Sequence, residues 1–200
     1  MVEKVYNMLL KKYGKQNWWP ISGRFAPKEL EICVGAILKQ NTNWKNVEKA
    51  LDNLIKAKKL SAEDIASTRL SALEKLLRPS GTYRQKARRI KDFANFIANF
   101  DGDFYKDVTR DQLLAVKGIG RETADSILLY ACNKPYFVVD TYTRRLFSQI
   151  GIIKGNEDYD EIRGLIEKNL LRDVHTYREF HALIVENGKK KARAAKVLSA

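Results

Sequence analysis

The chain has 200 residues, of which 44% are hydrophobic, so it is long enough and apolar enough to fold around a core and is not a disordered segment. Its 37 lysines and arginines against 24 aspartates and glutamates give a net charge of +13, which favours a polyanionic partner, with nucleic acid first. A basic protein that merely repels itself is the alternative. The two cysteines, Cys33 and Cys132, are too few for a four-cysteine metal cluster and indicate buried thiols in a reducing compartment.

The N-terminal stretch MVEKVYNMLL is too short and too charged to be a signal peptide. No apolar run reaches the roughly 18 residues that a membrane span needs. We therefore expect a cytoplasmic protein that makes no membrane contact.

Apolar residues recur at helical spacing through the first half of the chain. Gly14 can end the first helix, Pro27 suits the first position of the second, and Asn43 can cap the third. Ser61 and Ser71 are N-cap candidates for two short helices. The expected helices cover residues 2–13, 27–40, 44–57 and the two short segments after these serines.

The second half continues this pattern. Pro79-Ser80-Gly81 indicates a turn, and Thr109 can cap a helix. The expected helices cover residues 82–100, 111–116, 121–131, 141–150, 157–171 and 174–188. No run alternates with period two for long, and residues 137–139 are too few to predict a strand. The predicted fold class is therefore all-α.

The segment VKGIG, residues 116–120, lies between two helical patterns and predicts a helix–hairpin–helix motif. Glycines tolerate positive φ and let a flat surface approach the backbone. The amides after the turn sit at a helix N-terminus, which attracts an anion such as a DNA phosphate, and Lys117 and Arg121 add charge. A plain helix end and turn is the alternative. A dinucleotide fingerprint would need a third glycine where Thr123 stands, and a P-loop would need Gly-Lys-Ser/Thr.

Several separate blocks resemble one protein family, in the family's order. LLAVKGIGRETADSILLYA followed by FVVDTYTRRL is similar to the signature of the helix–hairpin–helix DNA glycosylase superfamily, endonuclease III-like group. ILKQNTNWKNVEKAL resembles the helix pair that supplies the group's DNA-inserting glutamine, and SGTYRQKARRI resembles its G-x-Y-x-x-K-A helix. NWWP, KQNT, RPSG and FHALIVE together resemble the type III 3-methyladenine DNA glycosylases. The likeness covers roughly residues 15–188.

The resemblance implies a two-lobed helical glycosylase fold. Residues 28–135 would form the lobe that carries the helix–hairpin–helix, and residues 1–27 plus 136–200 the second lobe. Double-stranded damaged DNA would bind across the cleft between the lobes, with the damaged nucleotide flipped out of the duplex. The resemblance thus implies a nucleoid-associated enzyme, and we expect a monomer.

Asp140 is the catalytic candidate by this resemblance. Breaking an N-glycosidic bond builds positive charge on the sugar, which a carboxylate can stabilise while it helps to position or deprotonate water. The alternative is an N-cap for the following helix, and both roles can hold together. Glu122 stands where bifunctional relatives carry a lysine, and a carboxylate cannot form the Schiff base of the lyase reaction. The sequence therefore predicts a monofunctional glycosylase that leaves an abasic site.

The base pocket implied by the resemblance is aromatic. Stacking on aromatic rings tolerates any base, and indole faces add a cation–π attraction for a positively charged N3-alkylated purine. The expected pocket residues are Trp18, Trp19, Pro20 and Trp44. Burial in the core is the alternative for each tryptophan.

Gln40 corresponds to the family's DNA-inserting glutamine, which fills the space left by the flipped nucleotide. A polar residue at a helix end is the alternative. Thr82 stands where some relatives insert a bulky residue into the opposite strand. The other expected DNA contacts are Arg84, Lys86, Lys117, Gly118, Gly120, Arg121 and Thr123. For Arg84 and Lys86, a merely solvated helix face is the alternative.

The resemblance also suggests a monovalent cation, sodium or potassium, that helps the hairpin to grip phosphate. The candidate ligands are the backbone carbonyls of Leu114, Val116 and Ile119. Many relatives end in four cysteines that bind an iron–sulfur cluster, but no cysteine follows Cys132, so neither a cluster nor a catalytic cofactor is expected. His175 and His181 lack metal-ligand spacing and are interpreted as structural.

Two other functions stay open on the sequence. Within the same enzyme class, a mismatch thymine or uracil glycosylase, or an oxidised-base glycosylase, is the runner-up, because the pocket chemistry differs little in sequence. Outside that class, the chain can be a non-catalytic helix–hairpin–helix DNA-binding protein. Asp140 and the aromatic pocket argue against this last reading, because a pure phosphate binder needs neither.

Overall fold

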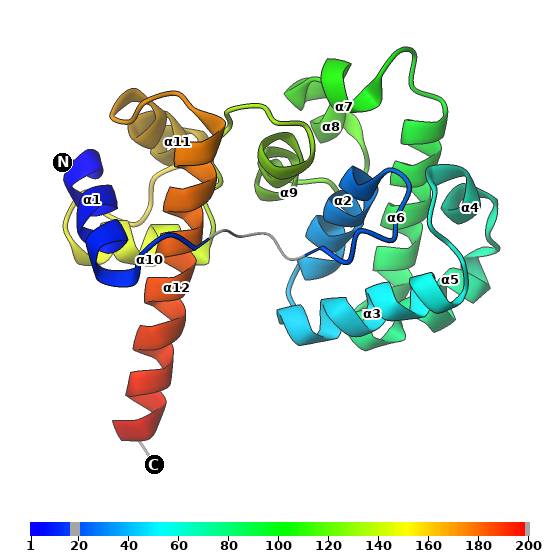
Figure 1. The fold of residues 1–200 in the computed structure, drawn as a ribbon, viewed down its shortest axis with the longest axis horizontal. Coiled ribbons are helices and arrows are strands. Elements are labelled where there is room, and N and C mark those ends of the chain that lie inside the picture. Colours follow the sequence, from blue (N-terminus) through cyan, green and yellow to red (C-terminus); the bar gives the residue numbers. More distant parts are fainter. Residues whose placement is uncertain (17–20, 199–200) are drawn as a thin grey trace. The chain divides into compact units, whose positions relative to one another are not determined.

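The computed structural model describes residues 1–16 and 21–198, with side chains as far as Lys191. Within these residues the chain is helical and contains no strand, which confirms the all-α prediction. The fold divides into two compact units, one of residues 20–132 and one of residues 1–19 with 133–200 (Figure 1). No helix in the described part is long and apolar enough to cross a membrane.

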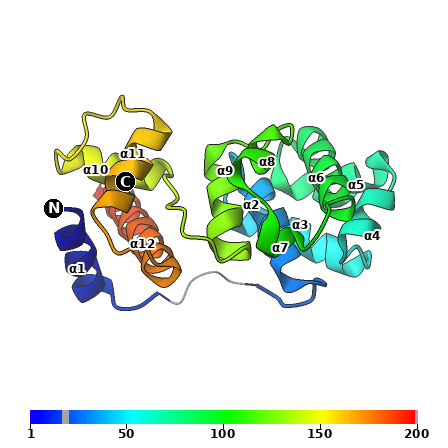
Figure 2. The ribbon, with the colours of Figure 1, turned by 90° about the horizontal axis from the view of Figure 1, so that it is seen from above.

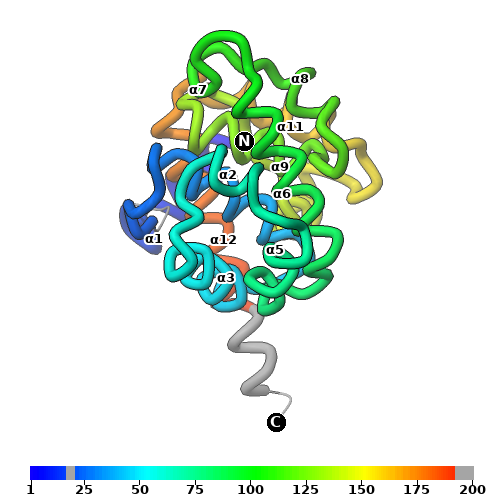
Figure 3. The backbone as a smooth tube through the Cα atoms, turned by 90° about the vertical axis from the view of Figure 1, so that its right-hand side faces the viewer, coloured from blue at the N-terminus to red at the C-terminus, as the bar shows by residue number. Residues whose placement is uncertain are grey.

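The 20–132 unit is built around one buried helix, α2 (Lys28–Lys39), of which nine of twelve residues are buried. Around it pack α3 (Trp44–Lys56), α6 (Tyr83–Ala98) and the helix that follows the hairpin. The shorter helices α4 (Ala62–Ser67) and α5 (Leu70–Leu77) lie against α6 (Figures 1 and 3). The remaining elements are the turn η1 (Arg78–Ser80), α7 (Phe104–Asp107), α8 (Arg110–Ala115), α9 (Arg121–Ser126) and η2 (Ile127–Ala131).

The other unit joins both ends of the chain. Its longest helix, α12 (Val174–Leu198), packs against α1 (Val2–Tyr13) and against α10 (Thr141–Gln149) (Figure 2). The fourth helix of this unit is α11 (Tyr159–Lys168). Hydrogen bonds from Tyr13 to Asn187 (3.0 Å) and from the Gln16 amide to Glu179 (2.7 Å) fasten the N-terminal segment to α12. The two ends of the sequence therefore stabilise one another.

Local signals placed most of the helix ends correctly. Asn43 caps α3, Ser61 caps α4 in a reciprocal box with Asp64, and Thr109 caps α8 in a box with Gln112. These three caps were predicted and are confirmed.

Three predicted details were wrong. Ser71 is no cap, because α5 begins at Leu70 after Arg69, where no side chain caps it and packing of its apolar face on α6 fixes the start. Pro27 is the N-cap residue of α2 rather than its first helical residue. The helix predicted over residues 121–131 is α-helical only as far as Ser126, and its last five residues widen into one π-helical turn, η2.

Candidate active site and nucleic-acid interface

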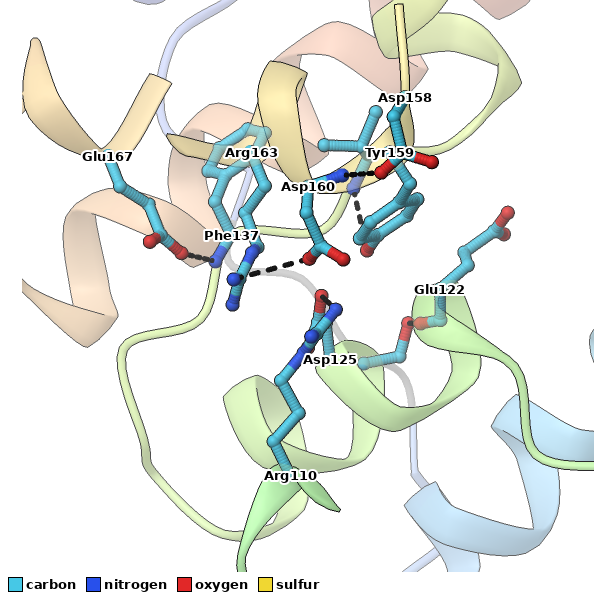
Figure 4. A network of polar contacts seen from close by, with 11 residues as sticks. Arg110, Glu122, Asp125, Phe137, Asp158, Tyr159, Asp160, Arg163 and Glu167 are labelled. Atoms are coloured by element: carbon cyan, nitrogen blue, oxygen red, sulfur yellow. Dashed lines mark hydrogen bonds and ion pairs between the residues drawn. The ribbon is translucent and has the colours of Figure 1, made fainter. Parts of the chain in front are cut away.

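Asp140 ends an extended segment whose backbone is fixed by side chains of α11. The Phe137 amide donates to Glu167 Oε1 (2.8 Å), and the Val139 amide donates to the Tyr159 hydroxyl (3.2 Å) (Figure 4). Residues 137–139 are buried. Buried apolar side chains and two backbone hydrogen bonds thus hold the chain in place up to the carboxylate. Glu167 and Tyr159 could not be predicted as partners from the sequence, because they lie 30 and 20 residues beyond the amides that they bind.

The two carboxylate oxygens of Asp140 have different neighbours. Oδ1 accepts hydrogen bonds from the Thr143 amide (2.8 Å) and the Thr143 hydroxyl (3.0 Å), so Asp140 is the N-cap of α10. Oδ2 lies 3.6 Å from His181 Nε2 on α12. The Asp140 side chain is only 15% exposed. Asp140 is therefore confirmed as a helix cap. The cap uses only Oδ1, and Oδ2 lies outside it.

The pKa of Asp140 reflects opposing effects. Burial raises it, while hydrogen bonding and charge from His181, together with the two Thr143 contacts, lower it. The lowering effects prevail, so the pKa of Asp140 lies below its ordinary value. Asp140 is consequently a carboxylate at neutral pH although it is largely buried.

His181 was expected to be only structural, but it is the neighbour of the catalytic candidate. Its side chain is buried, and its ring lies edge-on to Phe137 with centroids 6.5 Å apart. His175, in contrast, is exposed at the start of α12. Among the described residues, no group of three or more His, Cys, Asp or Glu side chains is arranged to hold a metal ion.

The Gly-Ile-Gly turn has the predicted helix–hairpin–helix form, with α8 before it and α9 after it. Gly118 has φ +87°, in the left-handed region, whereas Gly120 is the N-cap of α9 with φ −90°. The Ile119 amide donates to the Val116 carbonyl (3.0 Å), and the Ile119 side chain is buried. Lys117 and Arg121, both expected to contact DNA, are exposed on either side of the turn.

Gln40 is fastened to this hairpin. Its Nε2 donates to the Gly118 carbonyl (3.2 Å) and to Thr123 Oγ1 (3.0 Å), and its Oε1 accepts a hydrogen bond from Arg89 of α6. Gln40, Gly118 and Thr123 were each expected to contact DNA, and the fold brings them together. The Thr123 side chain is buried and its hydroxyl accepts the hydrogen bond from Gln40, so the expected DNA contact at Thr123 would have to be made by its backbone.

Lys86 was expected on a DNA-binding face, and the structure contradicts this. Its side chain is 1% exposed, and its Nζ donates to the carbonyls of Leu38 (2.9 Å) and Ser80 (2.6 Å). Burial, with the positive charges of Arg89 and Lys39, lowers its pKa to about 8. Lys86 therefore ties the end of α2 to the turn before α6. Arg84 on the same helix is exposed, as a DNA contact requires.

The two hairpin glycines allow a matched test of why glycine is needed. A Cβ on Gly118 would lie 2.5 Å from Arg89 Nε, whereas a Cβ on Gly120 would meet nothing within 4 Å. We expect Gly118→Ala to lower the free energy of unfolding by about 1–3 kcal/mol and to weaken DNA binding, because left-handed strain adds to displacement of Arg89. Gly120→Ala should cost less, because it meets no steric clash and loses only the preference for glycine over alanine at an N-cap.

Thermal unfolding and DNA binding of the two variants provide the measurement. A stable Gly120→Ala protein with lowered DNA affinity would place a phosphate against Gly120. Equal stability of both variants would contradict the steric argument at Gly118.

The other predicted residues are distributed as follows. Trp44 is the first residue of α3 and is half-buried, whereas Trp18, Trp19 and Pro20 lie outside the described residues. Glu122 is exposed in the first turn of α9, where its carbonyl accepts the Ser126 hydroxyl (2.7 Å). Both cysteines, Cys33 and Cys132, are buried and unbridged in the 20–132 unit, and burial raises the pKa of the Cys33 thiol.

A buried ion pair that the sequence did not indicate joins the two helices of the hairpin. Arg110 of α8 donates from Nε to Asp125 Oδ1 (2.7 Å) and from Nη2 to Oδ2 (3.2 Å) (Figure 4). The Asp125 side chain is fully buried, and that of Arg110 is 14% exposed. This bidentate contact fixes the angle between α8 and α9 and hence the shape of the turn.

Relatives in sequence cover nearly the whole chain. The chain is 46% identical, over 96% of its length and 89% of the other, to a protein of Methanocaldococcus jannaschii assigned as a DNA repair glycosylase. It is 26% identical to endonuclease III of Thermotoga maritima, over 95% of this chain and 84% of that one.

Solved structures of DNA glycosylases are also similar to this chain. The H. pylori 3-methyladenine DNA glycosylase bound to 1,N6-ethenoadenine is 35% identical and superposes with a TM-score of 0.80 over 95% of this chain and 96% of that one. An endonuclease III–DNA complex, 22% identical with a TM-score of 0.76, has the same fold. The sequence profile of the HhH-GPD superfamily of base excision DNA repair proteins matches residues 34–172. The chain therefore belongs to the HhH-GPD superfamily of base excision DNA repair proteins.

Proposed function

We propose that this DNA glycosylase is monofunctional and removes an N3-alkylated purine from double-stranded DNA, leaving an abasic site. The observation that carries the proposal is the state of Asp140, a largely buried carboxylate whose pKa is nevertheless held below its ordinary value. A carboxylate that stays ionised in a shielded position stabilises the positive charge that develops on the deoxyribose as the glycosidic bond breaks. Its Oδ2, which lies outside the helix cap, is the oxygen that does so.

Two observations support an alkylated purine as the base. The relative with 35% identity is a 3-methyladenine DNA glycosylase, and likeness extends over 95% of this chain. Trp44 provides a half-buried indole at the start of α3, and an electron-rich ring attracts a cationic base more than a neutral one. The glycosidic bond of such a base is already weak, so one carboxylate suffices.

An excision assay tests the function directly. Duplexes carrying 3-methyladenine, uracil, thymine opposite guanine, or 8-oxoguanine are incubated with the protein, and the released base is measured. We expect release of 3-methyladenine. Release of only uracil or thymine would make the protein a mismatch glycosylase, and release of only 8-oxoguanine an oxidised-base glycosylase. Tight binding without release of any base would leave a DNA-binding protein.

The identity of residue 122 predicts the outcome of chemical trapping. Sodium borohydride should trap no covalent complex between this protein and damaged DNA, because Glu122 supplies no amine for a Schiff base. Gel electrophoresis after reduction provides the measurement, with endonuclease III on its own substrate as the positive control. A trapped adduct would overturn the monofunctional proposal, and Lys117→Arg would then show whether Lys117 supplies the amine.

Trp44 gives a prediction about substrate choice. Trp44→Ala should weaken the flipped-base complex by roughly 1–3 kcal/mol, and Trp44→Phe should recover much of that, because a ring face remains. The loss should be larger for 3-methyladenine than for a neutral lesion. Single-turnover excision rates on the two lesions measure this, and affinity for undamaged duplex is the control. Equal losses on both lesions would remove the argument for charge selection.

The hairpin also suits a monovalent cation. Backbone carbonyls are the neutral oxygen ligands that sodium and potassium accept, and the Val116 carbonyl, which accepts the Ile119 amide, keeps a second lone pair. Leu114, Val116 and Ile119 would hold the ion, whose charge would strengthen phosphate binding at the hairpin.

A further inference from the structure

The two carboxylate oxygens of Asp140 are not equivalent, and the difference indicates a role for His181, which lies beside Oδ2. Oδ1 is occupied by two hydrogen bonds from Thr143, so it is committed to the start of α10. Oδ2 carries no cap contact and is the oxygen available to a reacting sugar. Its polar neighbour is Nε2 of His181, 3.6 Å away. Thr143 fixes the position of Oδ1 only. The carboxylate can still rotate about that oxygen, so the orientation of its plane depends on the neighbour of Oδ2.

His181 is held firmly enough to set that plane. Its side chain is 6% exposed, and its ring lies edge-on to Phe137, whose amide is itself bonded to Glu167 of α11. The helix that carries His181 has buried neighbours on both sides of it, Phe180 and Ala182, and packs directly on α10. A side chain this confined cannot move away from Oδ2 without disturbing the packing of α12.

We infer that His181 is a positioning residue for Asp140: its Nε2 edge holds Oδ2 in the orientation and charge state that base release needs. The inference deepens the proposed glycosylase function and rests on it. His181 acts through Asp140 and is given no contact with DNA. The Asp140 pKa supports the inference, because contact with His181 is the foremost of the effects that lower it.

The other titratable groups around the pair do not supply the same effect. Arg144 on α10 donates to the Glu157 carbonyl (2.8 Å), and Glu167 on α11 accepts the Phe137 amide. Tyr177, one turn before His181 on α12, has its pKa raised to about 12 by burial and by nearby Glu167, so it stays neutral at physiological pH. A change in the titration of Asp140 on replacing His181 is therefore attributable to His181.

Two substitutions separate the Nε2 contact from the packing of the ring. His181→Phe keeps a ring against Phe137 and removes the polar edge, whereas His181→Gln keeps an N–H donor near the Nε2 position. We expect His181→Phe to lower the single-turnover excision rate roughly 10- to 100-fold, because the carboxylate loses its orientation. The fall in the excision rate at low pH should occur at a higher pH in His181→Phe than in the wild type, since loss of a pKa-lowering contact raises the pKa of Asp140. His181→Gln should recover most of the rate, and DNA affinity should be unchanged in both variants.

The titration of the Asp140 carboxyl, followed by carbon-13 NMR, keeps this inference separate from the proposed function. A raised Asp140 pKa in His181→Phe, with a slower rate, supports the inference. Wild-type excision combined with an unchanged rate and pKa in His181→Phe overturns it. A raised pKa in a protein that releases no base would support the contact and overturn the proposed function instead. His181→Leu, which is smaller, serves the same comparison if the phenylalanine is not accommodated.

Discussion

Asp140→Asn is expected to lower the rate of base release by about 10²–10⁴-fold while DNA affinity stays at the wild-type level. Asparagine has nearly the same shape and is itself a good N-cap, so α10 should still begin at Thr141. What the substitution removes is the negative charge that, in the proposed mechanism, stabilises the developing oxocarbenium ion. We expect DNA affinity to be set by phosphate contacts elsewhere, for which the exposed Lys117 and Arg121 are candidates.

Asp158→Asn is a matched control. Asp158 is also an aspartate N-cap, that of α11, with its side chain bonded to the Asp160 amide (2.9 Å). Both substitutions therefore replace an aspartate cap by asparagine, but only Asp140→Asn changes the catalytic candidate. Single-turnover kinetics should show a large loss for Asp140→Asn and none for Asp158→Asn. Base release near the wild-type rate in Asp140→Asn would reduce Asp140 to a helix cap.

The same variant has an expected pH signature in stability. A group whose pKa is lowered in the folded state contributes stability above its unfolded pKa, about 3.9 for aspartate. This contribution is lost as the pH falls through the folded pKa, which lies lower still for Asp140. Any stability advantage of the wild type over Asp140→Asn should thus be present at neutral pH and shrink below about pH 4.

The features predicted from the sequence are those encoded within a few residues. The side chains of Asn43 and Thr109 each accept a hydrogen bond from the backbone amide three residues ahead, and the two glycines of the hairpin lie two residues apart, so a short window contains the whole signal. The contact between Asp140 and His181 joins positions 41 apart, and that between Gln40 and Thr123 joins positions 83 apart. Only the packing of α10 on α12 and of α2 on α9 creates these pairs.

The wrong prediction for Lys86 has a different cause, because the spacing of nearby residues in the sequence does indicate that Lys86 is buried. Lys86 lies four and seven residues before Ile90 and Phe93, both buried, so it belongs to the apolar stripe of α6. The prediction of a DNA contact rested on the positive charges around Lys86 and did not consider its place in this stripe. A lysine on a buried stripe must satisfy its ammonium group internally, and here two backbone carbonyls do so.

Arg110→Ala should have the largest effect on stability. It leaves the fully buried carboxylate of Asp125 without its bidentate partner, and removing one member of a buried ion pair costs about 3–5 kcal/mol. Because the pair joins α8 to α9, amide hydrogen exchange in these helices should report the loss. Lys106→Ala is the matched control, since it removes an ion pair with Asp103 that is exposed to solvent, and it should leave exchange in the hairpin unchanged.

The double variant Arg110→Met with Asp125→Val separates the effect of the ion pair on stability from its effect on the shape of the hairpin. Replacing both charged groups by apolar side chains closer to them in size removes the buried carboxylate together with its arginine partner, so most of the lost stability should return. Arg110→Ala should also weaken DNA binding, and the double variant should recover that affinity only in part, because the directional contact that sets the angle between α8 and α9 is gone. Full recovery of both quantities would show that the pair contributes packing alone. If the single variant Arg110→Ala were as stable as the wild type, water or another side chain would have to satisfy Asp125, and the ion pair would not be what holds the hairpin in its DNA-binding form.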